Sequence, residues 1–244
     1  MLVVSVLRCS KDFTPKHAQW LHQQIRGIRS VCLTDAVYIE GVETAPLLYN
    51  WPGWWAKIEL FNPEHPVIGK EDILYIDIDT VITGDLHEFT NLQNMTMLTD
   101  FSCVGKENAP AASGIMFIPA KEKYRAWNAF KDNAEQIMSR NKLPPYHGDQ
   151  GFISEIYPDA ERWQDVLPGF IVSYKANIAT PKMIGFNAEL HDGLANGSVP
   201  ENARIVCFHG SPRPWQVALK WVPSYSLKNT IKAKIKQFKL SSRN

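Results

Sequence analysis

The stretch Ile73-Leu74-Tyr75-Ile76-Asp77-Ile78-Asp79-Thr80 decides the fold class, because a run of apolar residues ends abruptly in two aspartates. Residues 73–76 predict a buried strand, since short apolar runs of this kind fill the interior of α/β sheets. If the strand continues to residue 79, Asp77 and Asp79 point to the same face, because side chains alternate along a strand. Two adjacent carboxylates repel each other unless positive charge lies between them, and a hard divalent cation meets that need. The competing interpretation is an ordinary strand-end turn without a ligand.

Strands and helices alternate along the rest of the chain, which predicts an α/β fold with a mixed central sheet. We expect one domain over residues 1–225 and a separate tail over residues 226–244. Strands are predicted at residues 2–8, 31–33, 37–39, 73–76, 95–98, 115–118 and 204–208, and helices at residues 15–28, 54–61, 121–140 and 148–156.

The composition is that of a globular protein, with 45% hydrophobic and 21% charged residues in a chain of 244. The four cysteines form no CxxC pair, which argues against a zinc site and favours reduced thiols. The apolar N-terminus lacks a preceding basic segment and is interpreted as a first strand, not a signal peptide. No apolar run approaches the roughly 18–20 residues that span a bilayer. These features predict a cytoplasmic protein.

The tail over residues 226–244 differs sharply in charge from the rest of the chain. It holds six basic residues and no acidic ones, whereas the remainder holds 20 basic and 25 acidic residues. Leu227, Ile231, Ile235 and Phe238 are spaced as on one face of a basic amphipathic helix. Such a helix suits an anionic surface, either the inner face of a membrane or nucleic acid. A terminal helix that docks on the domain or frays is the alternative.

Three further segments carry side chains suited to chemistry. Lys57 ends the tryptophan-rich stretch 51–57 and has the charge to bind a diphosphate, although a single lysine on a helix is usually only solvated. Gly148-Asp149-Gln150-Gly151 opens a helix, where Asp149 either caps the helix or faces a ligand. The stretch 208–215 contains His209, Gly210 and Arg213 in a loop stiffened by two prolines. His209 could bind a metal, and the guanidinium of Arg213 has the shape to bind a phosphate through two hydrogen bonds.

These segments, in this order, resemble the GT-A glycosyltransferases, in particular the glycogenin and lipopolysaccharide galactosyltransferase group, glycosyltransferase family eight. The resemblance covers roughly residues 1–220. Residues 75–80 are similar to the family's metal motif, and residues 148–151 to its "GDQG" helix start. Residues 208–215 are similar to its closing "HFxGxxKPW" element. The resemblance implies a single Rossmann-like nucleotide-diphospho-sugar transferase domain.

The chain departs from the family pattern at several positions. Cys207 stands where the family has its metal-binding histidine, and His209 directly precedes Gly210. We favour His209 over Cys207 as the ligand, because manganese and magnesium prefer harder ligands than thiolate. Arg213 replaces the usual lysine, Ala112 replaces an asparagine, and the first loop lacks the usual Thr-Asn pair. A second resemblance, to short glycosyltransferase-like proteins of tailed phages and prophages, implies a phage-encoded protein in a bacterial host.

The resemblance implies a metal-dependent transferase that moves a sugar from a nucleotide-diphosphate donor, with UDP favoured, and retains the configuration. The acceptor stays open between glycolipid or lipopolysaccharide, protein and modified DNA. Mn²⁺ or Mg²⁺ would be held by Asp77, Asp79 and His209, while Asp149 and Gln150 would orient sugar or acceptor hydroxyls, with Asp100 as an additional contact. The donor would be contacted by Leu7, Arg8, Phe13, Lys57, Asp77, Ile78, Gly210 and Arg213.

Two other functions are compatible with carboxylates on an α/β sheet. A nucleotidyltransferase usually has a glycine-rich basic loop after its first strand, and the loop Arg8–Pro15 contains no glycine. A binding module for nucleotide sugars or nucleic acid that has lost its activity is the second alternative. The intact aspartate pair and His209 argue against it.

Overall fold

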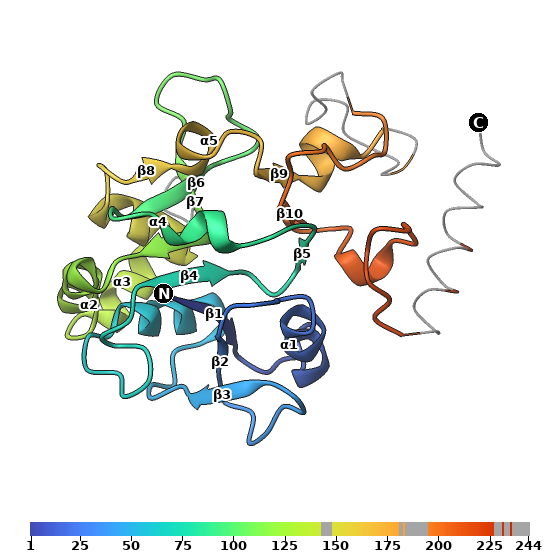
Figure 1. The fold of residues 1–244 in the computed structure, drawn as a ribbon. Helices are drawn as coiled ribbons and strands as arrows, with labels where there is room; N and C mark the ends of the chain where they lie inside the picture. The colour runs from blue at the N-terminus through green and yellow to red at the C-terminus, as the bar shows by residue number, and fades with distance from the viewer. Residues whose placement is uncertain (143–147, 181–182, 184–194, 227–230, 232–234, 236–244) are drawn as a thin grey trace.

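The computed structural model describes residues 1–142, 148–180, 183, 195–226, 231 and 235. Its centre is a seven-stranded sheet in which β1 runs parallel to β2 and β4, and β7 runs antiparallel to β4 and β6 (Figure 1). The predicted α/β fold with a mixed central sheet is therefore confirmed. In sheet order the strands are β3 (Glu43–Pro46), β2 (Ser30–Thr34), β1 (Leu2–Leu7), β4 (Ile73–Ile76), β7 (Ala111–Ile118), β6 (Thr96–Thr99) and β8 (Glu161–Arg162).

Helical segments cover both faces of this sheet, because its strands bury both sets of alternating side chains. Leu2 and Val4 of β1 pack in one hydrophobic cluster with the 3₁₀ helix η1 (Gly53–Phe61), α2 (Lys123–Phe130) and α4 (Gly148–Ile156). Val3 packs on the other side with Trp20 and Leu21 of α1 (Pro15–His22). Figure 1 shows α1 and α2 on opposite sides of β1 and β4.

A second sheet of three strands lies beside the first (Figure 1). Its central strand β10 (Ile205–Cys207) runs antiparallel to β5 (Thr80–Ile82) and parallel to β9 (Ile171–Ser173). The chain leaves the large sheet at the end of β4 and enters the small sheet at the start of β5. The three residues 77–79 therefore bridge the two sheets, and they include both aspartates of the pair.

Three predicted elements differ from the structure. The helix predicted over residues 15–28 ends at His22. The helix predicted over residues 121–140 is divided into η3 (Ala120–Glu122), α2 and α3 (Ala134–Arg140), with a break at residues 131–133. Asp132 and Asn133 lie in this break, and short polar side chains of this kind compete with helical hydrogen bonds. The strand predicted at residues 37–39 does not form. Val37 and Tyr38 are exposed there, and the edge strand β3 forms four residues later.

The remaining short elements connect the strands. They are η2 (His87–Thr90), α5 (Trp163–Val166), the π-helix η4 (Tyr174–Ile178) and η6 (Pro214–Gln216). All four cysteines are free. No helix in the described ranges combines the length and the apolar character needed to cross a membrane. The predicted basic helix over residues 226–244 lies outside the described residues, apart from Ser226 and the exposed Ile231 and Ile235.

Candidate active site

A cavity of about 1250 Å³ opens at the carboxyl edge of the large sheet. Arg8, Asp35 and Asp77 directly follow the parallel strands β1, β2 and β4, and this edge is where open α/β sheets bind ligands. The cavity wall includes every residue that the sequence assigned to the site, although their roles stay predictions. These residues are Leu7, Arg8, Phe13, Lys57, Asp77, Ile78, Asp79, Asp100, Asp149, Gln150, His209, Gly210 and Arg213.

Asp77 is held by residues of the large sheet. Its backbone N–H donates to the carbonyl oxygen of Gly114 on β7 at 2.9 Å. The hydroxyl of Tyr75 donates to its carboxylate, since Tyr75 and Asp77 lie two residues apart and point the same way. Burial raises the pKa of Tyr75 well above its ordinary value, so this hydroxyl keeps its proton. A Cβ atom on Gly114 would lie 3.3 Å from the Asp77 carboxylate, so glycine gives the carboxylate room there.

Lys57 lies buried between two carboxylates. Its Nζ is 3.0 Å from Oδ2 of Asp149 and 3.4 Å from Oδ1 of Asp77. The hydroxyl of Ser113 donates to Asp149 at 2.8 Å and lies 3.3 Å from the same amine. The sequence placed Lys57 at a diphosphate, whereas in the structure its amine joins Asp77 to the start of α4. Oδ2 of Asp149 contacts both Lys57 and Ser113, so this carboxylate faces the cluster as well as standing in the first turn of α4.

Asp79 directly precedes β5 of the small sheet and pairs with Arg213. The guanidinium of Arg213 donates to Oδ2 of Asp79, and the backbone N–H of Phe208 donates to the Asp79 carbonyl at 3.3 Å. Burial, followed by the negative charge of Asp77, raises the pKa of Asp79 to about 7, although Arg213 opposes the shift. The two aspartates therefore act on each other electrostatically. Positive charge at this point favours the ionised form of both.

His209 lies in the same cavity wall but has its own partners. Its Nε2 is 2.7 Å from the hydroxyl of Ser173, and its ring stacks on Phe101 with the centroids 5.6 Å apart. Burial, followed by the charge of Lys175, lowers the pKa of His209 to about 4, so the ring is neutral near pH 7. A neutral imidazole keeps a lone pair for a metal. Because Nε2 contacts Ser173, Nδ1 is the nitrogen left for a cation.

The carboxylate oxygens at the junction of the two sheets are of the chemical type that a hard divalent cation binds. Asp77 and Asp79 offer carboxylate oxygens to one cavity, and each is neutralised in the structure by a side-chain cation. Mn²⁺ and Mg²⁺ are bound by oxygens of this type. No three His, Cys, Asp or Glu side chains converge on one point within the described residues. His209 shares the cavity wall with the aspartate pair, and its role as a third ligand stays a prediction.

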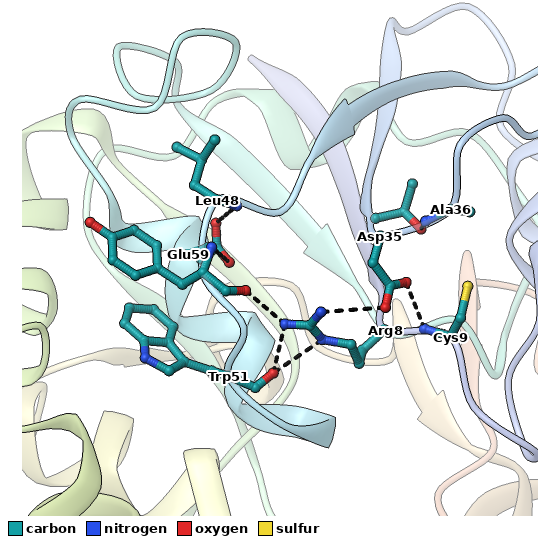
Figure 2. A network of polar contacts seen from close by, with 9 residues as sticks. Arg8, Cys9, Asp35, Ala36, Leu48, Trp51 and Glu59 are labelled. Atoms are coloured by element: carbon teal, nitrogen blue, oxygen red, sulfur yellow. Dashed lines mark hydrogen bonds and ion pairs between the residues drawn. The ribbon is translucent and has the colours of Figure 1, made fainter.

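The loop after β1 is fixed by Arg8, as Figure 2 shows. The Arg8 guanidinium donates to the carbonyl oxygens of Trp51 at 2.9 Å and Tyr49 at 2.7 Å, and pairs with Asp35 at 3.3 Å. Asp35 in turn accepts the backbone N–H of Cys9 at 2.8 Å. The sequence placed Arg8 at the nucleotide. In the structure its charged end ties the first loop to the segment that leads into η1, the helix that carries Lys57.

Phe13 also lines the cavity, and the guanidinium of Arg213 lies 5.1 Å from its ring centroid. Trp215 packs edge-on against the same ring at 6.0 Å. These contacts hold the loop after β1 against the loop after β10. They bring together two segments that lie about 200 residues apart in the sequence.

The sequence analysis did not predict the contacts that Ser113, Ser173 and the hydroxyl of Tyr75 make in the site. Tyr75 had a usable signal, because a tyrosine two residues before an aspartate shares its face of a strand. Ser113 and Ser173 had none, because their partners come from distant parts of the chain.

Comparison with known proteins shows the fold but not the family. No family model and no curated protein sequence matches the chain. Among solved structures, the galactosyltransferase LgtC in complex with donor and acceptor sugar analogues matches with a TM-score of 0.57 and 13% identity, over 100% of this chain and 96% of that chain. The fold is that of the GT-A glycosyltransferases. GlyE of Streptococcus pneumoniae TIGR4 matches with a TM-score of 0.60 and 13% identity, over 99% of this chain and 63% of that chain.

Proposed function

We propose that this GT-A chain is a glycosyltransferase that moves a sugar from a nucleotide-diphosphate donor, with UDP favoured, to an acceptor and requires a divalent cation. The observation that supports the proposal most is the pair Asp77 and Asp79 at the junction of the two sheets. Both carboxylates face a cavity large enough for a nucleotide sugar, and the fold is one that glycosyltransferases use. LgtC was solved with donor and acceptor sugar analogues, which supports a sugar acceptor here as well.

Each residue has a proposed role in this reaction. Asp77, Asp79 and, through Nδ1, His209 would hold Mn²⁺ or Mg²⁺, which supplies Lewis-acid chemistry to the diphosphate when bound. Arg213 lies beside Asp79 and would bind the departing diphosphate, where negative charge increases as the sugar leaves. Asp149 and Gln150 would orient hydroxyl groups of the sugar. Lys57 would keep the carboxylates of Asp77 and Asp149 at a fixed separation. The resemblance to family eight supports retention of configuration.

A screen of nucleotide sugars for hydrolysis in the presence and absence of Mn²⁺ tests the proposal. We expect one UDP-sugar to be hydrolysed faster than the others, and only with the cation. Preference for CTP or GTP would instead support a nucleotidyltransferase. Binding of UDP without turnover of any donor or acceptor would support an inactive binding module.

The variant Asp79→Asn tests the aspartate pair itself. Asparagine keeps the size of the side chain and an oxygen that accepts from Arg213, but it removes the charge that would hold a cation. We expect hydrolysis to fall by about 100-fold or more, while circular dichroism stays unchanged. Asp132→Asn is the matched control, because Asp132 is exposed and lies outside the cavity wall. Turnover of the Asp79→Asn protein at the wild-type rate would refute the assignment.

A further inference from the structure

The small sheet brings Lys175, which the sequence analysis overlooked, close to Gly210 of the cavity wall, although Lys175 is not itself one of the wall residues. β9 and β10 run parallel with Ser173 opposite Cys207, so the residues that follow them emerge at the same edge. Phe208, His209 and Gly210 follow β10, whereas Lys175 is the second residue of the π-helix η4, which follows β9. Single π-helical turns are rare in proteins overall, but those that do occur are often found at functional sites.

The amine of Lys175 approaches the backbone of Gly210. Its Nζ lies 3.5 Å from the position that a Cβ atom on Gly210 would occupy. Gly210 has a φ of 74°, a left-handed conformation that favours glycine, and it lines the cavity. The stem of Lys175 is half-buried, so its charged end is directed toward this loop and not freely into solvent.

The side chains of Lys175 and Arg213 therefore place two positive charges near Gly210. Burial, followed by the charge of Arg213, lowers the pKa of Lys175, and the negative charge of Asp79 opposes the shift, so Lys175 lies within electrostatic reach of both members of the Arg213–Asp79 pair. Arg213 pairs with Asp79, whereas no carboxylate in the described part of the chain lies within ion-pair distance of Lys175. Two positive charges within electrostatic reach of each other raise the free energy of the site, and an anion that binds between Lys175 and Arg213 lowers it.

We propose that Lys175 binds the diphosphate of the nucleotide donor, beside Gly210 and Arg213. This inference rests on the proposed function. A lysine is suited to the role, because its ammonium is a compact charge on a flexible stem that follows phosphate oxygens as they move. A fixed cation at this point also stabilises the negative charge that builds on the diphosphate as the bond to the sugar breaks. Lys175 thereby supplies a charge that Arg213, while paired with Asp79, provides only in part.

The test is calorimetric titration of the full chain with Mn²⁺ present, using UDP, inorganic pyrophosphate and uridine as probes. We expect Lys175→Ala to weaken binding of UDP and pyrophosphate by about tenfold or more and to leave uridine binding unchanged, because uridine carries no phosphate. Lys175→Arg should restore most of the loss. Lys131→Ala is the matched control, because Lys131 is exposed in the break between α2 and α3, whereas Lys175 approaches Gly210 of the cavity wall.

The outcomes separate this inference from the proposed function. If wild type binds UDP and Lys175→Ala binds it equally well, the inference is wrong and the proposed function stands. If the variant loses affinity for uridine as much as for UDP, Lys175 has only a structural role and the inference is again wrong. If wild type binds neither UDP nor pyrophosphate and hydrolyses no nucleotide sugar, both are wrong. Lys175→Gln, which keeps the length of the stem, replaces the alanine variant if that protein does not fold.

Discussion

Replacing Lys57 by methionine removes the cation between Asp149 and Asp77 while keeping a similar volume. Lys57 is 8% exposed and Asp149 is 6% exposed, so water cannot replace the lost charge at Asp149. Burial alone lowers the pKa of Lys57, but the charges of Asp149 and Asp77 outweigh it and raise the pKa above its ordinary value. Leaving one member of a buried ion pair alone costs about 3–5 kcal/mol. We expect a loss near 3 kcal/mol, because Asp77 is partly exposed and regains hydration.

A double-mutant cycle isolates this interaction. Asp149→Asn removes the stranded charge, so the double variant Lys57→Met/Asp149→Asn should be more stable than Lys57→Met alone. We expect a coupling free energy of about 2 kcal/mol, because the two groups are 3.0 Å apart and buried. Urea unfolding followed by tryptophan fluorescence measures it, since the chain has eight tryptophans. A coupling below about 0.5 kcal/mol would show that the pair is solvated in solution and would refute the reasoning.

Two further predictions concern buried bases outside the site. Burial lowers the pKa of Lys123 to about 7, and among the described residues its amine donates only to the carbonyl of Ile68. Lys123→Met should therefore raise the free energy of unfolding at pH 7 by about 1–3 kcal/mol. Urea titrations should show this advantage shrinking as the pH rises from 7 and disappearing only above 10.5, where Lys123 is neutral in both states. Burial likewise lowers the pKa of His22 from 6.5 to about 4. Its contribution to stability is present above pH 6.5 and is lost as the pH falls toward 4, by up to about 3 kcal/mol, and acid titration of His22→Gln should show a shallower loss.

The part of the site that the sequence predicted follows from local rules. An apolar run that ends in Asp77 and Asp79 identifies the carboxyl end of an interior strand, and ligands of α/β sheets bind at such ends. Each predicted segment begins or ends at that edge. The parallel pairing of β1 with β4 and the antiparallel pairing of β7 bring those segments to one cavity.

The partners of the charged groups could not be predicted in the same way. Lys57 lies twenty residues before Asp77 and more than ninety before Asp149, and no sequence pattern states that η1 and α4 meet. Lys175 had no visible signal, because its position depends on the parallel register of β9 with β10. The break in the helix over residues 121–140 was missed because its apolar spacing continues across Asp132 and Asn133.

The division of the aspartate pair between two sheets has a mechanical consequence. Asp77 is fixed by Gly114 and Tyr75 of the large sheet, whereas Asp79 is fixed by Phe208 and by Arg213, which follow the small sheet. Any change that shifts the small sheet against the large sheet must therefore alter the separation of the two carboxylates. A cation held by both would join the sheets directly, so its binding should stabilise the packing of one sheet on the other. Residues between the sheets can thus control the proposed metal site without contacting it.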